Sequence, residues 1–237
     1  MSVASESPAP TADQSPIEVN GAPLIGDLSG ALYWPARRLL VVADLHLEKG
    51  SSYAVSGQLL PPYDTTATLE RLAAACRRYA PARVLCLGDS FHDGEASERL
   101  AAEDRTRIEA LTGAYDWIWL CGNHDPEPPA DWGGRVESEL IEGPLVFRHE
   151  ALDGRRVAGE VSGHFHPKAS VKVRFRRLTA RCFVTDGRRL ILPAFGAFTG
   201  GLNVLEPAIA GLFPQGFEAH LLGRRQSFVY PKRALIF

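Results

Sequence analysis

Short apolar runs separated by polar segments form the dominant pattern of the chain. Three runs are continuous enough to predict buried strands, and each leads into polar residues: 38–47 (RLLVVADLHL), 82–87 (ARVLCL) and 117–121 (WIWLC). Between them, residues 64–79 predict a helix with Asp64 as its N-cap, and a mixed-charge segment predicts a second helix over about residues 97–111. This alternation predicts a layered sheet in which the loops at the carboxyl ends of the strands carry the chemistry.

The second half of the chain has a different pattern, because its apolar runs follow one another without a long predicted helix between them. Strands are predicted at 144–149, 160–162, 169–175, 181–185, 189–192, 217–222 and 227–236. Asp186-Gly187 favours a two-residue hairpin turn between two of them. We therefore predict a fold of the α/β or α+β class: a four-layer αββα sandwich of two mixed β-sheets flanked by helices, in a single domain over residues 17–237.

Residues 1–16 differ from the rest, since they are mostly Ser, Ala, Pro, Thr and acidic residues. Such a segment buries too little apolar area to offset the entropy of ordering, which predicts a flexible tail. Over the whole chain, 45% hydrophobic and 23% charged residues exclude a disordered protein. The formal net charge of −2 excludes non-specific coating of polyanions, so any contact with nucleic acid must be local.

The N-terminus lacks the basic start and apolar run of a signal peptide, and no apolar stretch approaches the ~20 residues that span a bilayer. We expect a cytoplasmic protein without a membrane partner. The cysteines show no CxxC pairing and lie in apolar segments, which predicts buried free thiols and no disulfide framework: Cys76, Cys86, Cys121 and Cys182.

Polar side chains of the metal-ligand type follow the apolar runs. Two pairs have i, i+2 spacing, which places both members on one side of a strand: Asp44 with His46, and His164 with His166. Three further residues follow predicted strands beside glycines: Asp89, Asn123 and His124. Unpartnered, such groups are costly to bury, and a metal cluster compensates them. Imidazole, carboxylate and amide together suit Mn, Fe, Zn or Co, and two ions about 3.5–4 Å apart can clamp a phosphate, with Asp89 bridging.

The ordered motifs resemble those of the calcineurin-like metallophosphoesterase superfamily. They are Asp44-x-His46, Gly88-Asp89, Gly122-Asn123-His124-Asp125, a lone His149, and Gly163-His164-x-His166. Any one of them occurs by chance in many chains, whereas five in order are specific. Residues 43–52, 88–93 and 192–203 are further similar to the DNA-ligase-associated branch of that superfamily.

The resemblance implies two divalent metal ions, with manganese expected first and iron, zinc or cobalt as alternatives. It places Asp44, His46, Asp89 and His166 on one ion, and Asp89, Asn123, His149 and His164 on the other. His124 is then unliganded and catalytic, able to protonate the leaving oxygen or to steady its charge. Asp125, the second catalytic candidate, either orients His124 or caps the turn before Pro126.

Three further features have no assigned function from the motifs: two of them keep alternative interpretations, and the third is interpreted as structural. His92 follows Asp89 by three residues and either lines the site, or lies at the surface or behind the residues that line it. The stretch from Phe195 to Gly201 is typical of packing and a tight turn, or walls the cleft. His220 lies in an apolar strand pattern and is interpreted as structural.

Residues 168–189 concentrate positive charge, with eight basic residues and one acidic residue. The run starts two residues after His166, so it is either a solvated strand face or a polyanion-binding surface beside the site. Its candidate substrate-binding residues are Arg174, Arg176 and Arg177. The favoured function is therefore a metal-dependent phosphodiesterase or endonuclease acting on DNA in repair.

Two other functions compete with the favoured one: a phosphoesterase of nucleotides, cyclic nucleotides or monoesters, and a non-catalytic scaffold. The complete ligand set and the presence of His124 argue against the scaffold. As partners, the resemblance implies functional association with a DNA ligase, helicase or exonuclease.

Overall fold

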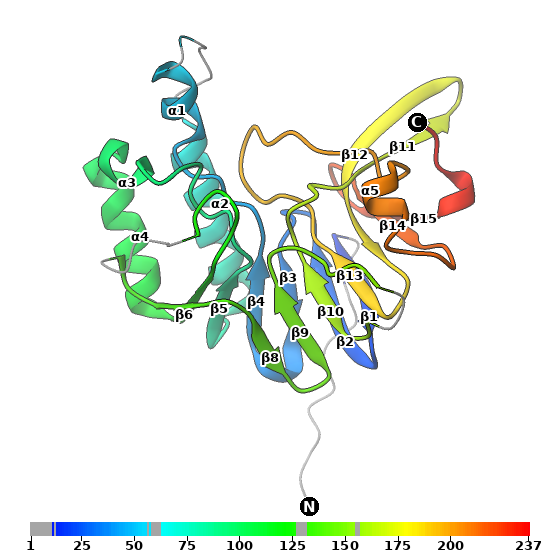
Figure 1. Ribbon diagram of the computed structural model, residues 1–237, viewed down its shortest axis with the longest axis horizontal. Helices are drawn as coiled ribbons and strands as arrows, with labels where there is room; N and C mark the ends of the chain where they lie inside the picture. Colours follow the sequence, from blue (N-terminus) through cyan, green and yellow to red (C-terminus); the bar gives the residue numbers. More distant parts are fainter. Residues whose placement is uncertain (1–10, 12, 56, 58–62, 127–131, 155–156) are drawn as a thin grey trace, which may run out of the picture.

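Two β-sheets packed against each other form the body of the computed structural model, which describes residues 11, 13–55, 57, 63–126, 132–154 and 157–237 (Figure 1). The first sheet has the strand order β1 (Gln14–Val19), β2 (Ala22–Asp27), β3 (Leu32–Trp34), β4 (Leu39–Val42), β5 (Arg83–Cys86), β6 (Asp116–Leu120) and β7 (Arg135–Glu137). The second has the order β15 (Ser227–Pro231), β14 (Glu218–Leu222), β12 (Arg176–Thr185), β13 (Arg189–Ile191), β10 (Glu160–Ser162), β9 (Leu145–Arg148) and β8 (Leu140–Glu142), and β11 (Lys168–Val173) pairs with β12 outside this order.

The helices are unevenly distributed between the two sheets. In the first sheet, α1 (Lys49–Val55) and α2 (Asp64–Tyr79) connect β4 to β5, and α3 (Ala96–Arg99) and α4 (Ala102–Ala114) connect β5 to β6. In the second sheet, only the short α5 (Pro207–Ala210) lies between described strands, β13 and β14. 3-10 turns span Pro35–Arg37 and Lys232–Ala234. The predicted two-sheet sandwich is confirmed. Its outer layer on the second sheet consists of α5, β11 and the end of the chain in place of long helices (Figure 1).

Parallel strands form one half of the first sheet and the β13-β10-β9 part of the second, and they position the functional loops. Strands β4, β5, β6 and β7 run parallel, as do β9, β10 and β13. Parallel neighbours end at the same edge of a sheet, so the loops that leave their carboxyl ends converge. The chemistry predicted for those loops is therefore gathered at one edge of the molecule.

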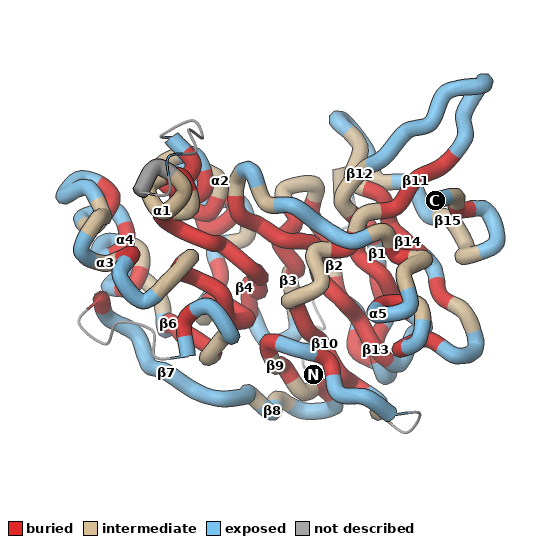
Figure 2. The backbone as a smooth tube through the Cα atoms, turned by 45° about the horizontal axis from the view of Figure 1, so that its top comes forward, coloured by how far each residue is buried: buried red, intermediate tan, exposed pale blue. Residues whose placement is uncertain are grey.

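The main core lies between the sheets, where Val41, Leu85 and Ile118 of the first sheet meet Phe147 and Val161 of the second (Figure 2). A second core lies under α2 and α4, and a third lies on the outer face of the second sheet. Each large apolar side chain buried in this way stabilises the fold by roughly 1.5–3 kcal/mol. The strands are thus fixed on both faces.

Arg189 and Glu160 form a buried ion pair that joins β13 to β10, with Arg189 Nε 2.7 Å from Glu160 Oε2. The remaining guanidinium donors bind the backbone carbonyls of Leu212 and Leu152. Arg148 Nη1 lies 3.4 Å from the other oxygen of Glu160. The charges are therefore compensated, and the pair connects the parallel strands of the second sheet.

Several predicted element boundaries were correct and others were wrong. The helix over residues 64–79 is confirmed, but Asp64 is its first residue and not its N-cap, because its carboxylate accepts the Gly50 N–H at 2.8 Å. The helix predicted over 97–111 is two helices, separated by extended backbone at Leu100 and Ala101. The strand predicted over 38–47 ends at Val42.

The N-terminal region is ordered earlier than predicted. The predicted tail extends to residue 16, yet β1 begins at Gln14 and pairs with β2. Ser15 Oγ lies 2.7 Å from His220 Nδ1, which confirms the structural role of that buried histidine. Residues 1–10 and 12 of the predicted tail lie outside the described residues. Within the described chain, no helix is long and apolar enough to cross a membrane.

Candidate metal centre

All seven residues predicted as metal ligands lie together at the carboxyl edge of the parallel strands. The loop after β4 carries Asp44 and His46, and the loops after β5, β6, β9 and β10 carry the others: Asp89, Asn123, His149, His164 and His166. Because the loops come from both sheets, the site lies where the two sheets meet. Its side chains form two neighbouring groups.

The first group contains Asp44, His46, His166 and one oxygen of Asp89. The Nε2 atoms of His46 and His166 lie 3.1 Å apart. His166 Nε2 lies 3.6 Å from Asp44 Oδ1, and His46 Nε2 lies 3.9 Å from Asp89 Oδ2. Potential ligand atoms from Asp44, His46 and His166 all fall within 4.8 Å of one another, so this group has the dimensions of a cation site.

The second group contains Asn123, His149, His164 and the other oxygen of Asp89. Asn123 Oδ1 lies 2.9 Å from both His149 Nε2 and His164 Nδ1, which are 3.1 Å from each other. His149 Nε2 lies 3.4 Å from Asp89 Oδ1. The two carboxylate oxygens of Asp89 therefore face different groups, which is the geometry that a bridging ligand requires.

The chemistry of these groups fits divalent cations. Asp44 and Asp89 are buried, and within the described part of the chain neither forms an ion pair with a lysine or an arginine. Burial lowers the pKa of His46 to about 2, with smaller contributions from His166 and His124. The neutral imidazole is the form that binds metal, and buried carboxylates without a cation are costly.

The backbone at the site has conformations that most residues avoid. Five predicted ligands have φ between 43° and 69°, in the left-handed region: Asp44, His46, Asp89, His164 and His166. Each such residue costs on the order of 1–3 kcal/mol, and these conformations concentrate at functional sites. They also correct the strand argument for both i, i+2 pairs, because β4 ends before Asp44 and β10 ends before His164. The turns of the loops bring Asp44 and His46 together in the first group and direct His164 and His166 to different groups.

Glycines allow the loops to pack closely around the ligands. A Cβ on Gly122 would clash with the backbone nitrogen and a carboxylate oxygen of Asp89, and would lie 2.6 Å from Asp125 Oδ1. Gly88, with φ of 77°, leaves room for His149, whose Nδ1 would lie 2.7 Å from an added Cβ. These positions tolerate no side chain without movement of a ligand.

The family model for calcineurin-like phosphoesterases matches residues 37–188, a range that contains every residue of both groups. The chain belongs to the calcineurin-like phosphoesterase family. Among solved structures, it is similar to the nuclease MPE of Pseudomonas putida, with 31% identity, a TM-score of 0.70, and coverage of 91% of this chain and 100% of that one.

The phosphoesterase Yfce of E. coli also matches, over 81% of this chain and 97% of its own, with 13% identity and a TM-score of 0.42; so distant a match adds nothing to the argument. No curated protein matches the chain. Membership of the calcineurin-like phosphoesterase family therefore rests on the family model, and the similarity to nuclease MPE supports the same fold.

Backbone carbonyls hold two histidines of this calcineurin-like phosphoesterase in defined tautomers. His149 Nδ1 lies 2.7 Å from the carbonyl oxygen of Leu87, so this nitrogen donates and Nε2 is left to bind metal. His124 Nδ1 lies 2.9 Å from the carbonyl oxygen of His92, which likewise leaves its Nε2 free. His149, which has the weakest sequence motif of the seven, is thus oriented toward the second group.

His92 is partly buried at the site, where it lies beside the ligand groups and its carbonyl supports His124. Its ring stacks on that of His124 with centroids 5.3 Å apart and meets the edge of His46 at 5.6 Å. Burial lowers the pKa of His92, with a further contribution from His124. Sequence spacing from Asp89 was the only signal available for this residue.

Asp125 binds the loop after β5, and the carbonyl of His92 takes the orienting position toward His124. Asp125 Oδ2 accepts hydrogen bonds from the backbone N–H groups of Ser90 and Phe91, at 2.8 and 3.2 Å. Burial raises the pKa of Asp125 to about 7. Its contacts therefore support the loop that carries Asp89, beside the reactive groups.

The start of the stretch from Phe195 to Gly201 packs against the first ligand loop, whereas Phe198 is exposed. Phe195 is buried, and its carbonyl accepts a hydrogen bond from Arg71 Nη2. A Cβ on Gly196 would clash with the carbonyl of Leu45, between the two ligands of the first loop. The packing interpretation is confirmed for this part of the stretch.

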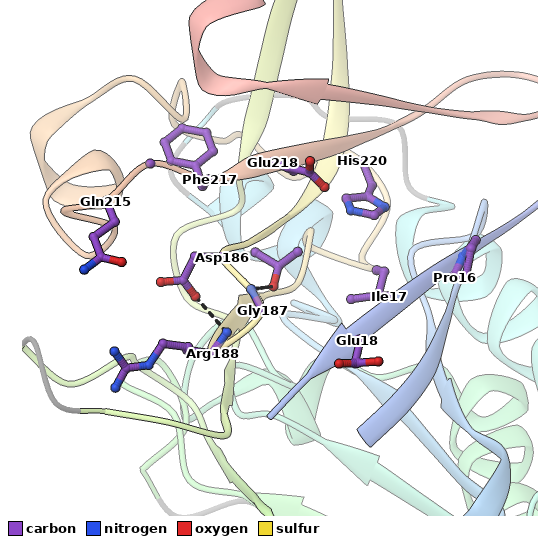
Figure 3. A pocket seen from close by; sticks show the side chains of 12 residues that line it. Pro16, Ile17, Glu18, Asp186, Gly187, Arg188, Gln215, Phe217, Glu218 and His220 are labelled. Atoms are coloured by element: carbon purple, nitrogen blue, oxygen red, sulfur yellow. Dashed lines mark hydrogen bonds between the residues drawn. The ribbon is translucent and has the colours of Figure 1, made fainter. Parts of the chain in front are cut away.

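A large cavity of the protein lies elsewhere than the candidate metal centre. A cavity of about 540 Å³ lies among β1, the β12–β13 turn and β14, where Glu18, Arg188 and Glu218 line it (Figure 3). It contains none of the seven ligand residues and lies toward the amino end of β13, away from the convergent loops. The ligand-type side chains, and not the cavity, mark the reactive centre.

Proposed function

We propose that this calcineurin-like phosphoesterase is a two-metal phosphodiesterase that cuts DNA. The observation that carries the proposal is the position of Asp89, whose oxygens face two separate groups of ligand atoms at 3.4 and 3.9 Å. The ligands combine imidazole, carboxylate and amide, which suits Mn, Fe, Zn or Co, and manganese is the metal proposed here. When bound, two such cations activate water and neutralise charge on the phosphoryl group.

The protein side chains would divide the remaining work. The seven ligand residues of the two groups would hold the cations, while the carbonyl of Leu87 fixes the tautomer of His149. His124 keeps Nε2 free, and its imidazolium form, protonated on both nitrogens, would donate the Nε2 proton to the departing oxygen while Nδ1–H stays bound to the His92 carbonyl. Its backbone N–H donates to Asp89 Oδ1 at 2.9 Å, which ties the acid to the bridging carboxylate.

Two observations support DNA as the substrate. The similar protein of known structure, with 31% identity over nearly the whole chain, is a nuclease. The basic run also follows directly after the last ligand, and a phosphodiester backbone is attracted to such a surface. A role in repair, with a DNA ligase, helicase or exonuclease as functional partner, belongs to the same proposal.

A comparison of three substrates tests the proposal. Manganese-loaded protein should hydrolyse single-stranded DNA and an aryl phosphodiester, and should act more slowly on an aryl phosphomonoester. Asp89→Asn should abolish all three activities, whereas His220→Gln, at a buried histidine outside the site, controls for folding. Preference for the monoester, with intact DNA, would support a small-molecule phosphoesterase instead, and inactivity on all three would support a scaffold.

A further inference from the structure

A basic β-hairpin of β11 and β12 projects from the body (Figures 1 and 2), and it follows the loop that carries His166. We call residues 170–179 the arm; they comprise the outer parts of β11 and β12 and the turn between them. Residues 172–179 are all exposed, and the arm starts four residues after His166. A strand rises about 3.3 Å per residue, so the tip stands on the order of 10 Å beyond Val171, the last buried residue of β11.

The arm carries positive charge without compensation. Four of its ten residues are basic and none is acidic: Lys172, Arg174, Arg176 and Arg177. Lys172 is directly opposite Arg177 in the register of the two strands, and like charges in that position destabilise a hairpin. Within the described chain, none of the four forms an ion pair with a carboxylate. An anionic partner would relieve this repulsion.

The tip of the arm presents an aromatic ring on a strained turn. Arg174 and Phe175 form the turn with φ of 46° and 66°, a conformation for which Asn-Gly is the favoured pair. Phe175 is 95% exposed, and Val173 and Leu178 behind it are also exposed. Bulky residues in the left-handed region are costly, and such outliers persist where they have a function.

We propose that the arm binds single-stranded DNA, with Phe175 stacked on an unpaired base and the basic side chains on the flanking phosphates. This inference rests on the proposed function. Alternating cations and an exposed aromatic ring are the combination that binds single strands, because every base has a π-face. A duplex exposes base faces only at its ends, so it would meet the cations but not the ring.

Variants at position 175 separate stacking from simple apolar contact. Phe175→Leu should raise the KM for cleavage of a thymidine 12-mer by about 5- to 100-fold, the range of base–aromatic stacking, and Phe175→Trp should restore it. The kcat for the aryl phosphodiester should not change in either variant. Phe228→Leu, at an exposed aromatic on β15, is the matched control and should have no effect.

Charge and base are tested separately. Arg174→Gln/Arg176→Gln should weaken binding and reduce the salt dependence by a slope of roughly 0.7 for each phosphate that the variant no longer neutralises. The control Arg38→Gln/Arg77→Gln removes two exposed arginines outside the basic run. An abasic 12-mer has no base for Phe175 to stack on. It should therefore inhibit cleavage of the thymidine 12-mer weakly, and to the same extent in the wild type and in Phe175→Leu.

The possible results distinguish failure of the arm from failure of the proposed function. Cleavage of DNA with an unchanged KM in Phe175→Leu would overturn the stacking inference alone. Hydrolysis of the aryl phosphodiester without cleavage of any DNA would overturn the DNA substrate itself. A change in oligomeric state by light scattering in Phe175→Leu, with unaltered DNA cleavage, would show a protein contact in place of a DNA contact.

Discussion

Replacement of His124 by glutamine removes the proposed acid while leaving the metal ligands in place. The backbone N–H of residue 124, and not its side chain, donates to Asp89 Oδ1, so the bridging carboxylate keeps this contact. The imidazole Nδ1 is held by the His92 carbonyl, and Nε2 is the atom available to the substrate. A positioned general acid contributes about 10²–10⁴ in rate, equivalent to about 2.7–5.4 kcal/mol of barrier.

The assay compares leaving groups under manganese saturation. For His124→Gln, kcat on DNA should fall by about 10²–10⁴, because the sugar oxygen leaves as a poor group without a proton. On an aryl phosphodiester the decrease should be much smaller, because the aryl oxide departs unprotonated. Metal content should stay that of the wild type. Equal decreases on both substrates would refute leaving-group protonation, and a fall in metal content would make His124 a ligand.

Three more predictions concern the packing. Gly122→Ala should displace the Asp89 carboxylate and lower the manganese content, measured by elemental analysis, whereas Gly113→Ala, with open space around the new methyl, should bind metal normally. Arg189→Leu removes the main charge partner of Glu160, so the free energy of unfolding measured in urea should fall by about 3–5 kcal/mol. A decrease below about 1 kcal/mol would contradict the importance of this ion pair. Burial raises the pKa of the thiols of Cys76, Cys86 and Cys182, that of Cys76 to about 12. In the native protein, an aromatic disulfide reagent at pH 8 should therefore leave these three thiols unreacted. Fast labelling would contradict their burial.

The candidate site could be predicted because its ligand-type residues come directly after apolar runs in the sequence. Asp89 and Asn123 each stand directly after a glycine that follows a strand, and although each motif alone is weak, their order with the histidine motifs is specific. The strand argument for Asp44 and His46 was wrong. Their spacing suggested one side of a strand, but left-handed turns after Val42 bring them together, and non-glycine turns of that kind have no clear sequence signal.

Parts of the fold escaped prediction because their signals are tertiary. The strands β1, β2 and β3 are short, mix polar and apolar residues, and are fixed by packing against Phe147 and Phe183 of the second sheet. The break between α3 and α4 has no proline or glycine to mark it. His92 could not be assigned because its role depends on a backbone carbonyl and a ring contact, neither of which has a side-chain pattern.

The most direct test of a two-metal centre bridged by Asp89 is the manganese stoichiometry of the purified protein, read together with its electron paramagnetic resonance spectrum. Wild-type protein should bind about two manganese ions per chain and show exchange coupling between them, since a bridged pair lies about 3.5–4 Å apart. Asp89→Asn should lose the coupling and at least one ion. One ion per chain in the wild type, with the spectrum of isolated manganese, would contradict the bridged centre.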